Sequence, residues 1–405
     1  MSTLTPLTST TAGLAPETYI YKILSNAPRT SPHTYTTSPT RLAIISSDDS
    51  LRFLDPSTFS LIPDGVIGKA HESITCLERA DDEGSLIATA GRDGLVKYWD
   101  ARVGGKGGPV MCITNPDKLI STLTTSYPHH LLATGLENPN DGPSDSPIHI
   151  FDLRSPSVPT LSLLDSHTDT ITTLSLHPSH PSLLLSSSTD NLLSIFDTSQ
   201  PTEDDALYQV INHGSAVAHA GFVYPSTDIY ALGTDETLSF YALQSVKEEE
   251  AEPEPRRLGD VRGVLGVEYV VDVVGVGGRW GVVGGRTSGQ KLDIIPLRKN
   301  EQTKEPLAYE CDLDAKVAIP GAHGEEIVRD LFVDVHSNTT FTVGEDGHVR
   351  AWKMPGSASI PMDEDVEIKD AKNSGDKERR ERKKERREKR EKKKADKEKA
   401  RFKPY

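Results

Sequence analysis

The residues of this chain that could perform chemistry are histidines that precede a Ser or Thr, an Asp and an aromatic residue at fixed distances. In the most complete set, His71 is followed by Thr89, Asp93 and Trp99. Side chains of these types make up the hydroxyl–imidazole–carboxylate relay of a nucleophilic enzyme when a fold brings them together. Two further sets follow the same order: His167, Ser186, Asp190 and Phe196, and His323, Thr342, Asp346 and Trp352.

The spacing of the three sets favours a structural role over catalysis. The His precedes the Asp by 22 or 23 residues in each set, and the aromatic residue follows the Asp by six. An enzyme needs one such site, whereas a structural repeat carries one network in each copy. We therefore expect each His to join the Asp of a tight turn to a strand hydroxyl, while the aromatic ring excludes water. Losing one partner should cost about 1–3 kcal/mol through an unsatisfied buried group.

The elements that must position these sets are short strands. Segments of β-favouring residues alternate with turns at intervals of about 40–50 residues, which indicates a β-propeller of four-stranded blades. In the clearest repeat, Leu86–Ala90 is an alternating strand, Gly91–Gly94 a tight turn and Leu95–Trp99 the next strand. The repeat at about 258–298 has lost these marks and is inferred from spacing. We count seven repeats and predict an all-β, seven-bladed propeller over residues 18–360.

The clearest repeats resemble those of the WD40 family: Leu86–Arg102, Leu183–Asp197 and Phe341–Trp352. The resemblance covers roughly residues 19–360, and the acidic insertions and the basic end resemble those of a nuclear member of that family. It implies a seven-bladed platform for other proteins, in which the His, Ser/Thr, Asp and Trp form structural networks. We found no phosphate-binding or zinc-binding motif with the required spacing. We therefore expect no catalysis, no cofactor and no metal.

The two ends of the chain are predicted to differ from the propeller. Residues 1–17 are expected to be a disordered leader, since they lack the cationic start and apolar core of a signal peptide. After Trp352 too little chain remains for the outer strand of the last blade. We expect Tyr19–Leu24 to supply that strand and so to close the ring. The three cysteines lie far apart, which fits a reducing intracellular compartment better than a disulfide framework.

Charge divides the chain into an acidic body and a basic end. The net charge is −15, but residues 377–405 hold 17 Lys and Arg against 7 Asp and Glu, and the rest holds 28 against 53. Residues 361–405 are predicted to be a charged, disordered and partly helical tail with a basic cluster at 377–403 and no coiled-coil stripe. The tail is a candidate signal for nuclear localisation, nucleolar included, with a cytoplasmic fraction. Its densest basic residues are Arg379, Arg380, Arg382, Lys383, Lys384, Lys392, Lys393 and Lys394.

The acidic body favours basic protein clients, or a multi-protein nuclear complex, through long-range electrostatic attraction. Contact of the tail with RNA is compatible with its charge, and so is a purely solubilising tail. An acidic insertion at 246–257 is predicted to be a solvated loop. We predict a monomeric propeller without a membrane span. Candidate partner-binding residues lie in the turns on the rim that carries the histidines: Arg92, Thr189, Thr234, Arg286 and Glu345.

The segment Trp99-Asp100-Ala101-Arg102 supports a more specific hypothesis. In substrate receptors of cullin-4 ubiquitin ligases, a WD repeat that ends in W-D-x-R presents its Arg to an acidic pocket on the adaptor. By this resemblance Arg102 is a candidate contact for such an adaptor, and Phe151-Asp152-Leu153-Arg154 is a weaker second copy. Arg is also common at this position in WD repeats with no ligase connection. The sequence therefore favours a non-catalytic scaffold and leaves open a ligase receptor and a ribosome-assembly factor.

Overall fold

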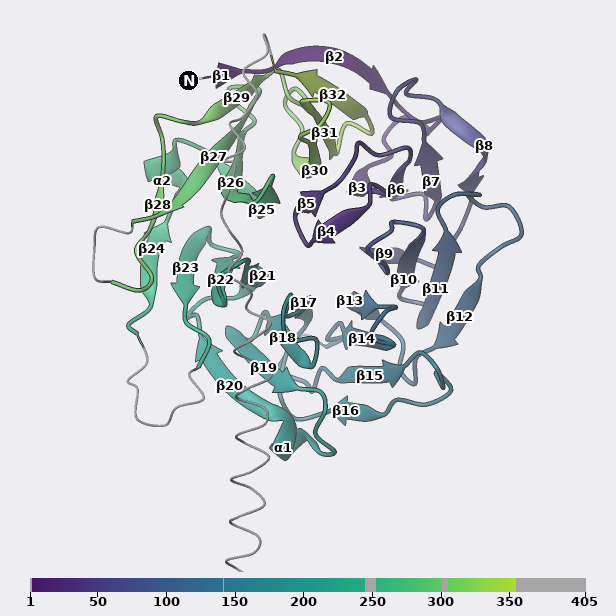
Figure 1. Ribbon diagram of the computed structural model, residues 1–405, viewed down its shortest axis with the longest axis vertical. Coiled ribbons are helices and arrows are strands. Elements are labelled where there is room, and N and C mark those ends of the chain that lie inside the picture. Colours follow the sequence, from purple (N-terminus) through teal and green to yellow (C-terminus); the bar gives the residue numbers. More distant parts are fainter. Residues whose placement is uncertain (1, 141, 245–252, 301–304, 355–405) are drawn as a thin grey trace, which may run out of the picture. The chain divides into compact units, whose positions relative to one another are not determined.

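The computed structural model describes residues 2–140, 142–244, 253–300 and 305–354. These residues form seven blades around an axis, so the predicted all-β, seven-bladed propeller is confirmed (Figure 1). Two one-turn helices lie between strands, α1 (Glu203–Ala206) and α2 (Arg262–Leu265). Among the residues described, no helix has the length and apolar character needed to cross a membrane. The predicted tail and its basic clusters lie outside this part of the chain.

Each blade is built around four strands that follow one another outward from the axis. Blade 1 contains β3 (Ile20–Ser25), β6 (Leu42–Ser46), β7 (Leu51–Leu54) and β8 (Leu61–Ile67). Blade 2 contains β9 (Ile74–Arg79), β10 (Leu86–Gly91), β11 (Leu95–Asp100) and β12 (Met111–Thr114). Blade 3 contains β13 (Ile120–Ser126), β14 (Leu131–Leu136), β15 (Ile148–Asp152) and β16 (Leu161–Leu163). Blade 4 contains β17 (Ile171–Leu176), β18 (Leu183–Ser188), β19 (Leu192–Asp197) and β20 (Leu207–Asn212).

The remaining blades follow the same order, with additions in blades 6 and 7. Blade 5 contains β21 (Val217–Val223), β22 (Asp228–Gly233), β23 (Thr237–Tyr241) and β24 (Arg256–Asp260). Blade 6 contains β25 (Tyr269–Val276), β26 (Arg279–Arg286), β27 (Lys291–Lys299), β29 (Val317–Pro320), the short β28 (Tyr309–Cys311) and β1 (Ser2–Thr3). Blade 7 contains β30 (Val328–Asp334), β31 (Thr339–Gly344), β32 (Val349–Lys353) and β2 (Thr5–Thr10). Because β24 starts at Arg256, the last two residues of the insertion predicted at 246–257 belong to a strand.

The core lies between neighbouring blades. Between blades 3 and 4, Ile148 and Ile150 share one buried cluster with Leu184 and Phe196. The second strand of a blade is covered on both faces, and every residue of β6 is buried. Since the apolar face of each blade is covered by the next blade, no single blade could be stable alone. The predicted strands can therefore bury their apolar side chains only when the blades form a closed ring.

The ring is closed by the first ten residues, so the predictions of a disordered leader at 1–17 and of closure by Tyr19–Leu24 are wrong. Strand β2 pairs with β32 as the outer strand of blade 7, while β3 is the inner strand of blade 1. The reason lies in side-chain polarity. The sequence of β2 is TPLTST, whose exposed polar residues and Pro6 suit an edge strand. In contrast, Ile20 and Ile23 of β3 are buried between blades.

The loop between β3 and β6 contains a two-stranded hairpin that sequence analysis did not predict, β4 (Arg29–Ser31) and β5 (Thr34–Tyr35). Figure 1 shows this hairpin inside the ring of inner strands. Its contacts reach three blades: Arg29 donates to Asp82 of blade 2 at 2.7 Å, and His336 of blade 7 lies 2.8 Å from the carbonyl oxygen of Tyr35. The ring of His33 packs against Trp280 of blade 6 at 4.6 Å between centroids. The hairpin therefore lies across one end of the central channel.

The loops define two faces of the propeller. The His/Asp face carries the loop before each inner strand and the turn between the second and third strands of each blade. The opposite face carries the hairpin and the other loops between first and second strands. In six blades the residue after the second strand donates its N–H to the carbonyl of the residue before the inner strand, as Arg92 does to Ser73 at 2.9 Å. The predicted placement of both loop types on one rim agrees with these bonds.

Candidate functional site

The histidine network of blade 2 joins all four residues of its predicted set. Nδ1 of His71 lies 3.1 Å from Oδ1 of Asp93, and Nε2 lies 2.8 Å from the hydroxyl of Thr89. The indole N–H of Trp99 donates to the same hydroxyl at 2.8 Å. The carboxylate of Asp93 also accepts the N–H groups of Glu72 and Leu95, so it ties the tight turn to the entering loop.

The network of blade 7 repeats this arrangement. His323 lies 2.6 Å from Asp346 and 2.8 Å from the hydroxyl of Thr342, and Trp352 donates to that hydroxyl at 2.9 Å. Arg350 adds an ion pair to Asp346 at 2.6 Å. Burial opposes ionisation of Asp346, but the hydrogen bonds that it accepts from His323, from Arg350 and from the backbone N–H of His348 outweigh burial and lower its pKa to about 2. The carboxylate is therefore ionised throughout the neutral range.

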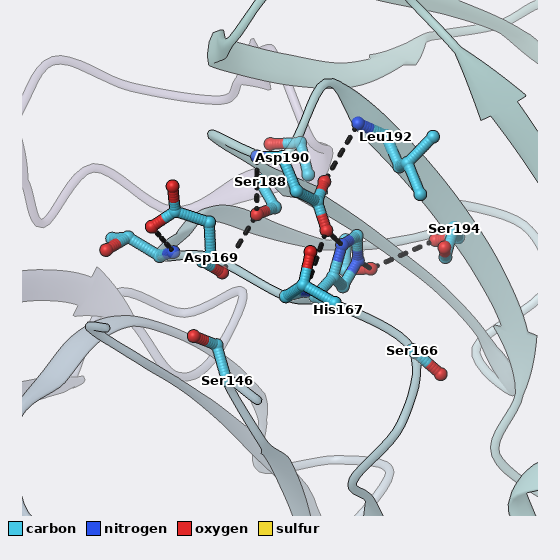
Figure 2. A network of polar contacts seen from close by, with 12 residues as sticks. Ser146, Ser166, His167, Asp169, Ser188, Asp190, Leu192 and Ser194 are labelled. Carbon is cyan, nitrogen blue, oxygen red and sulfur yellow. Dashed lines mark hydrogen bonds and ion pairs between the residues drawn. The ribbon is translucent and has the colours of Figure 1, made fainter. Parts of the chain in front are cut away.

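The network of blade 4 has the same contacts without the indole. His167 and Asp190 face each other in Figure 2. Nδ1 of His167 lies 2.9 Å from Asp190, and its Nε2 lies 2.7 Å from the hydroxyl of Ser186. Phe196 stands where the other two blades have Trp, and it has no N–H to donate. The hydroxyl of Ser186 also lies 3.3 Å from the carbonyl oxygen of Ser194. The hydroxyl of Ser186 is therefore also close to a backbone carbonyl of its own blade.

Chemically, these networks are closed to substrates. Because ionised Asp93 accepts from Nδ1 of His71, Nε2 of that ring is the acceptor for the hydroxyl of Thr89. The oxygen of that hydroxyl in turn accepts a hydrogen bond from the indole N–H of Trp99. Thr89 is 0% exposed and His71 is 3% exposed. Burial lowers the pKa of His71, although Asp93 acts in the opposite direction. The geometry therefore holds loops and strands together.

Two blades depart from the pattern in ways that spacing did not reveal. His213 stands 22 residues before Asp235, but its ring contacts the hydroxyls of Tyr241 and Thr237, each at 3.0 Å. In blade 3, Asn115 takes the place of the His and accepts from the hydroxyl of Thr134 at 2.8 Å. The Asn-Pro-Asp sequence before β13 is the signal that could have located this substitute, because it precedes the inner strand as the other histidines do.

The five predicted partner-binding residues lie at equivalent places on the His/Asp face, just after or at the end of a second strand. Thr234 and Arg286 are exposed. Arg92 forms an ion pair with Glu137 of blade 3 at 2.6 Å, and Glu345 forms one with Arg329. The positions therefore form a ring in which two members are already paired.

Thr189 differs from the other four, because its hydroxyl is buried and has no hydrogen-bond partner among the described residues. A buried hydroxyl cannot meet a partner protein without a local rearrangement. Among the predicted positions, Thr234 and Arg286 are thus the ones most open to contact.

Comparison with known proteins agrees with this geometry. The family model "WD domain, G-beta repeat" matches residues 65–100 and 158–197. The chain is 32% identical over 330 residues to "Uncharacterized WD repeat-containing protein YNL035C" of Saccharomyces cerevisiae, an alignment that covers 78% of this chain and 76% of the relative. This chain belongs to the WD repeat family. A second WD repeat protein, "Uncharacterized WD repeat-containing protein C63.06" of Schizosaccharomyces pombe, is 28% identical over 299 residues, or 71% of this chain and 85% of the relative.

WD repeat propellers generally serve as scaffolds for protein–protein interaction, which gives the coarse function of this chain. The relatives extend the family assignment across most of the propeller, whereas the family model matches only the repeats of blades 2 and 4. A closer likeness to WD repeat-containing protein 89, which the basic end of this chain suggested, stays a prediction.

The His/Asp face of this WD repeat protein is acidic all the way around. Every blade contributes a carboxylate to it, as shown by Asp48, Asp93, Glu137, Asp190, Asp235, Glu268 and Glu345. Several of these are used in networks, but Glu72, Glu325 and Glu326 are exposed and form no ion pair with described residues. A peptide that approaches this face therefore meets unpaired negative charge.

Two tyrosines that sequence analysis did not select lie at the centre of the same face. Tyr19 and Tyr21 are 43% and 41% exposed, and the carbonyl of Tyr19 accepts the N–H of Ser47 after the second strand of blade 1. Exposed tyrosines supply large contact area with a polar tip and are enriched in interfaces. Their alternation with the buried Ile20 was the signal, because it shows that the two rings cannot both be part of the core.

The proposed ligase contact, Arg102, lies on the opposite face at the end of β11. Its side chain is 71% exposed and binds Asp100 through two nitrogens, at 2.9 and 2.6 Å. Arg154 makes the same contact with Asp152 in blade 3 and is 69% exposed. The two arginines therefore lie at equivalent, accessible positions of neighbouring blades, each with its charge already balanced.

Proposed function

We propose that this WD repeat protein is a non-catalytic scaffold that docks basic segments of protein clients on its His/Asp face. The observation that carries the proposal is the combination of unpaired carboxylates and exposed aromatic rings at one end of the channel. Glu72 and Glu325 supply the charge, and Tyr19 and Tyr21 supply contact area beside it. Basic segments are attracted to such a face, and aromatic rings accept Lys and Arg through cation–π contacts.

The histidine networks support the part of this proposal that assigns the protein no catalytic activity. In three blades the hydroxyl, imidazole and carboxylate bind one another and are covered by neighbouring strands. They fix the loops whose outer residues form the docking face. A buried network of this kind also makes the face rigid, which reduces the ordering cost of binding.

A peptide titration tests the proposed face. We expect a fluorescent peptide rich in Lys and Arg to bind the full chain, with an affinity that falls as salt is raised from 0.15 M to 1 M. Two charge reversals, Glu72→Lys with Glu325→Lys, should weaken binding roughly fivefold or more. The matched control reverses two exposed acids away from the face, Glu83→Lys with Asp204→Lys, and should bind as the wild type does. Equal weakening by both pairs would mean that only total charge matters and would remove the proposed face.

Nuclear localisation is the second part of the proposal and rests on the basic residues of the tail. Deleting 377–403 from a tagged protein should shift it from the nucleus to the cytoplasm, while an unchanged nuclear signal would exclude the tail as the import signal. The same tagged protein can be used to test the alternative function, ribosome assembly. That alternative requires sedimentation with pre-ribosomal particles, lost in high salt.

The ligase-receptor alternative is favoured by one observation, the repeated exposure of Arg102 and Arg154 in adjacent blades. If Arg102 contacts a cullin-4 adaptor, purification of the wild type recovers the adaptor and Arg102→Ala loses it. The mutant should keep its fold, because the side chain is exposed and, within the described part of the chain, its hydrogen bonds go to Asp100. Absence of the adaptor from the wild-type sample would eliminate this function.

A further inference from the structure

A cavity of about 560 Å³ occupies the central channel on the side of the hairpin. Inner strands of all seven blades line it. Exposed loop residues such as His129 and Pro181 also line it, which places its opening on the face opposite the His/Asp face. The volume is within the range of about 300–1,000 Å³ that is typical of ligand pockets. The cavity is therefore large enough to hold a side chain together with part of a peptide backbone.

The hairpin β4–β5 forms one wall of this cavity. Tyr35 packs edge-on against Phe332 at 5.3 Å, and His33 packs against Trp280 at 4.6 Å between ring centroids. Gly275 makes room for this contact, since a Cβ there would lie 2.3 Å from Cγ of His33. The hairpin is thus fitted against blades 6 and 7. Loops of blades 3 and 4 border the remaining part of the opening.

Acidic side chains outnumber Lys and Arg among the residues that line the cavity. Lys22 pairs with Glu78 at 2.7 Å and so neutralises it. Two further carboxylates, Asp272 and Asp330, line the cavity from β25 and β30 and have no Lys or Arg ion-pair partner among the described residues. Nδ1 of His219 lies 4.0 Å from the carboxylate of Asp272. The channel thus holds two carboxylates that form no ion pair with a Lys or Arg of the described residues.

Both carboxylates are held in place by neighbouring groups. Asp330 accepts the N–H of Ile23, across the seam between blades 7 and 1, at 2.9 Å, and Asp272 accepts the hydroxyl of Tyr230 at 3.3 Å. Burial and the charge of Asp272 raise the pKa of Asp330 to about 6, although Lys22 acts in the opposite direction. Lys22, Asp272 and Tyr35 are the titratable groups that face Asp330. A cation placed beside Asp330 would therefore stabilise its ionised form.

The wall from blades 3 and 4 offers free hydrogen-bonding groups. The hydroxyls of Thr124, Thr173 and Ser175 line the cavity, are partly exposed and form no hydrogen bond with described residues. His177, 3% exposed, also lines it. Its Nδ1 accepts the N–H groups of Ser179 and His180, so its proton is on Nε2, which has no partner among the described residues. The three hydroxyls of this wall can therefore donate to oxygen atoms of a ligand, whereas Nε2 of His177 is buried and would reach one only after a local rearrangement.

We propose that this cavity receives the side chain of a Lys or Arg residue from a partner peptide. The ammonium or guanidinium group lies between Asp272 and Asp330, and carbonyl oxygens of the peptide accept from the hydroxyl wall. Charge and hydrogen-bond donors at opposite walls match a basic residue within a peptide, which has a cation at one end and carbonyl groups at the other. The site lies on the other face from the docking surface proposed above and does not depend on it.

Isothermal titration calorimetry of the full chain tests this site. Nα-acetyl-arginine amide and Nα-acetyl-lysine amide should bind, while Nα-acetyl-glutamine amide, the neutral match, should not. Asp272→Asn and Asp330→Asn should each weaken binding about tenfold, and Asp204→Asn, at an exposed acid of α1 outside the cavity lining, should leave it unchanged. Lowering the pH from 7.5 to 5.0 should weaken binding about fivefold, because Asp330 becomes protonated.

Asp330→Asn could disturb the contact between blades 7 and 1 at Ile23. A second variant, which is expected to strengthen binding, keeps the proposal testable in that case. Lys22→Met removes the competing ammonium group and should strengthen binding about threefold. Equal binding of the glutamine amide would overturn the proposal, as would unaltered affinity in folded Asp272→Asn and Asp330→Asn proteins. Binding of spermidine without binding of either amino-acid amide would show that the cavity takes free amines and would overturn the peptide as its source.

Discussion

Replacing Thr89 by Val tests the structural role of the blade 2 network. The hydroxyl of Thr89 pairs with Nε2 of His71 and accepts the indole N–H of Trp99, each at 2.8 Å. Val has nearly the same shape, so the substitution removes the hydroxyl without opening a large cavity. Two buried polar atoms then lose their partner, and each costs about 1–3 kcal/mol. We therefore expect Thr89→Val to lower the free energy of unfolding by roughly 2–6 kcal/mol.

Ser186→Ala in blade 4 is the matched comparison. Phe196 has no N–H, so only Nε2 of His167 loses its partner, and the expected loss is roughly 1–3 kcal/mol. Urea unfolding followed by circular dichroism gives both values, provided that each variant unfolds in a single transition. An effect of Thr89→Val no larger than that of Ser186→Ala would refute the claim that the indole N–H depends on this hydroxyl.

Three other predictions concern closure, pH and the exposed arginine. Deleting residues 2–10 removes β2 and the buried Leu4, so it should lower stability by roughly 5 kcal/mol or more, and an unchanged melting temperature would contradict closure by this strand. Because folding lowers the pKa of Asp346 from 3.8 to about 2, its stabilisation is present above about pH 4 and is lost as the pH falls toward 2. Asp346→Asn should thus cost about 2 kcal/mol at pH 7 and far less at pH 2 in parallel urea titrations. Arg102→Ala should leave the unfolding midpoint unchanged, and a marked shift would show that the Asp100 contact supports the fold.

The sequence was sufficient to predict the number of blades, because the repeat carries its own marks. His71 and Asp93 act at short range within one blade, so their spacing reports a local geometry that recurs. His213 and Asp235 have the same spacing, but the ring of His213 binds the hydroxyls of Tyr241 and Thr237 instead. Spacing fixes which residues can meet, but the competition between two hydrogen-bond partners depends on side-chain positions.

Long-range pairing accounts for the errors in the predicted ends. Strand β2 is polar and exposed, and it acquires its structure only by pairing with β32, which lies more than 300 residues away in the chain. Nothing within residues 5–10 distinguishes such an edge strand from a polar leader. The hairpin β4–β5 was missed for a similar reason, because its contacts with Asp82, Trp280 and Phe332 come from three other blades. Pro28 and Pro32 lie in or beside the hairpin, and contacts with these blades order it.

The cavity and the two central tyrosines depend on the same long-range arrangement. Asp272 and Asp330 are ordinary strand residues in the sequence, and only ring closure brings both to the cavity that Lys22 also lines. The acidic character of the body was visible from composition, but its concentration on the His/Asp face was not. The candidate partner-binding residues lie on the rim where the sequence placed them, and their role stays a prediction, whereas the exposed acids and Tyr19 and Tyr21 required the structure.

Quantitative affinity purification of the full-length protein from nuclear extract tests the central claim most directly. Three proteins are compared: wild type, the face pair Glu72→Lys with Glu325→Lys, and the control pair Glu83→Lys with Asp204→Lys. A scaffold that docks basic clients on the His/Asp face should lose a defined set of Lys- and Arg-rich proteins in the face pair alone. Retention of the same proteins by all three samples would contradict that claim and place client binding elsewhere on the propeller.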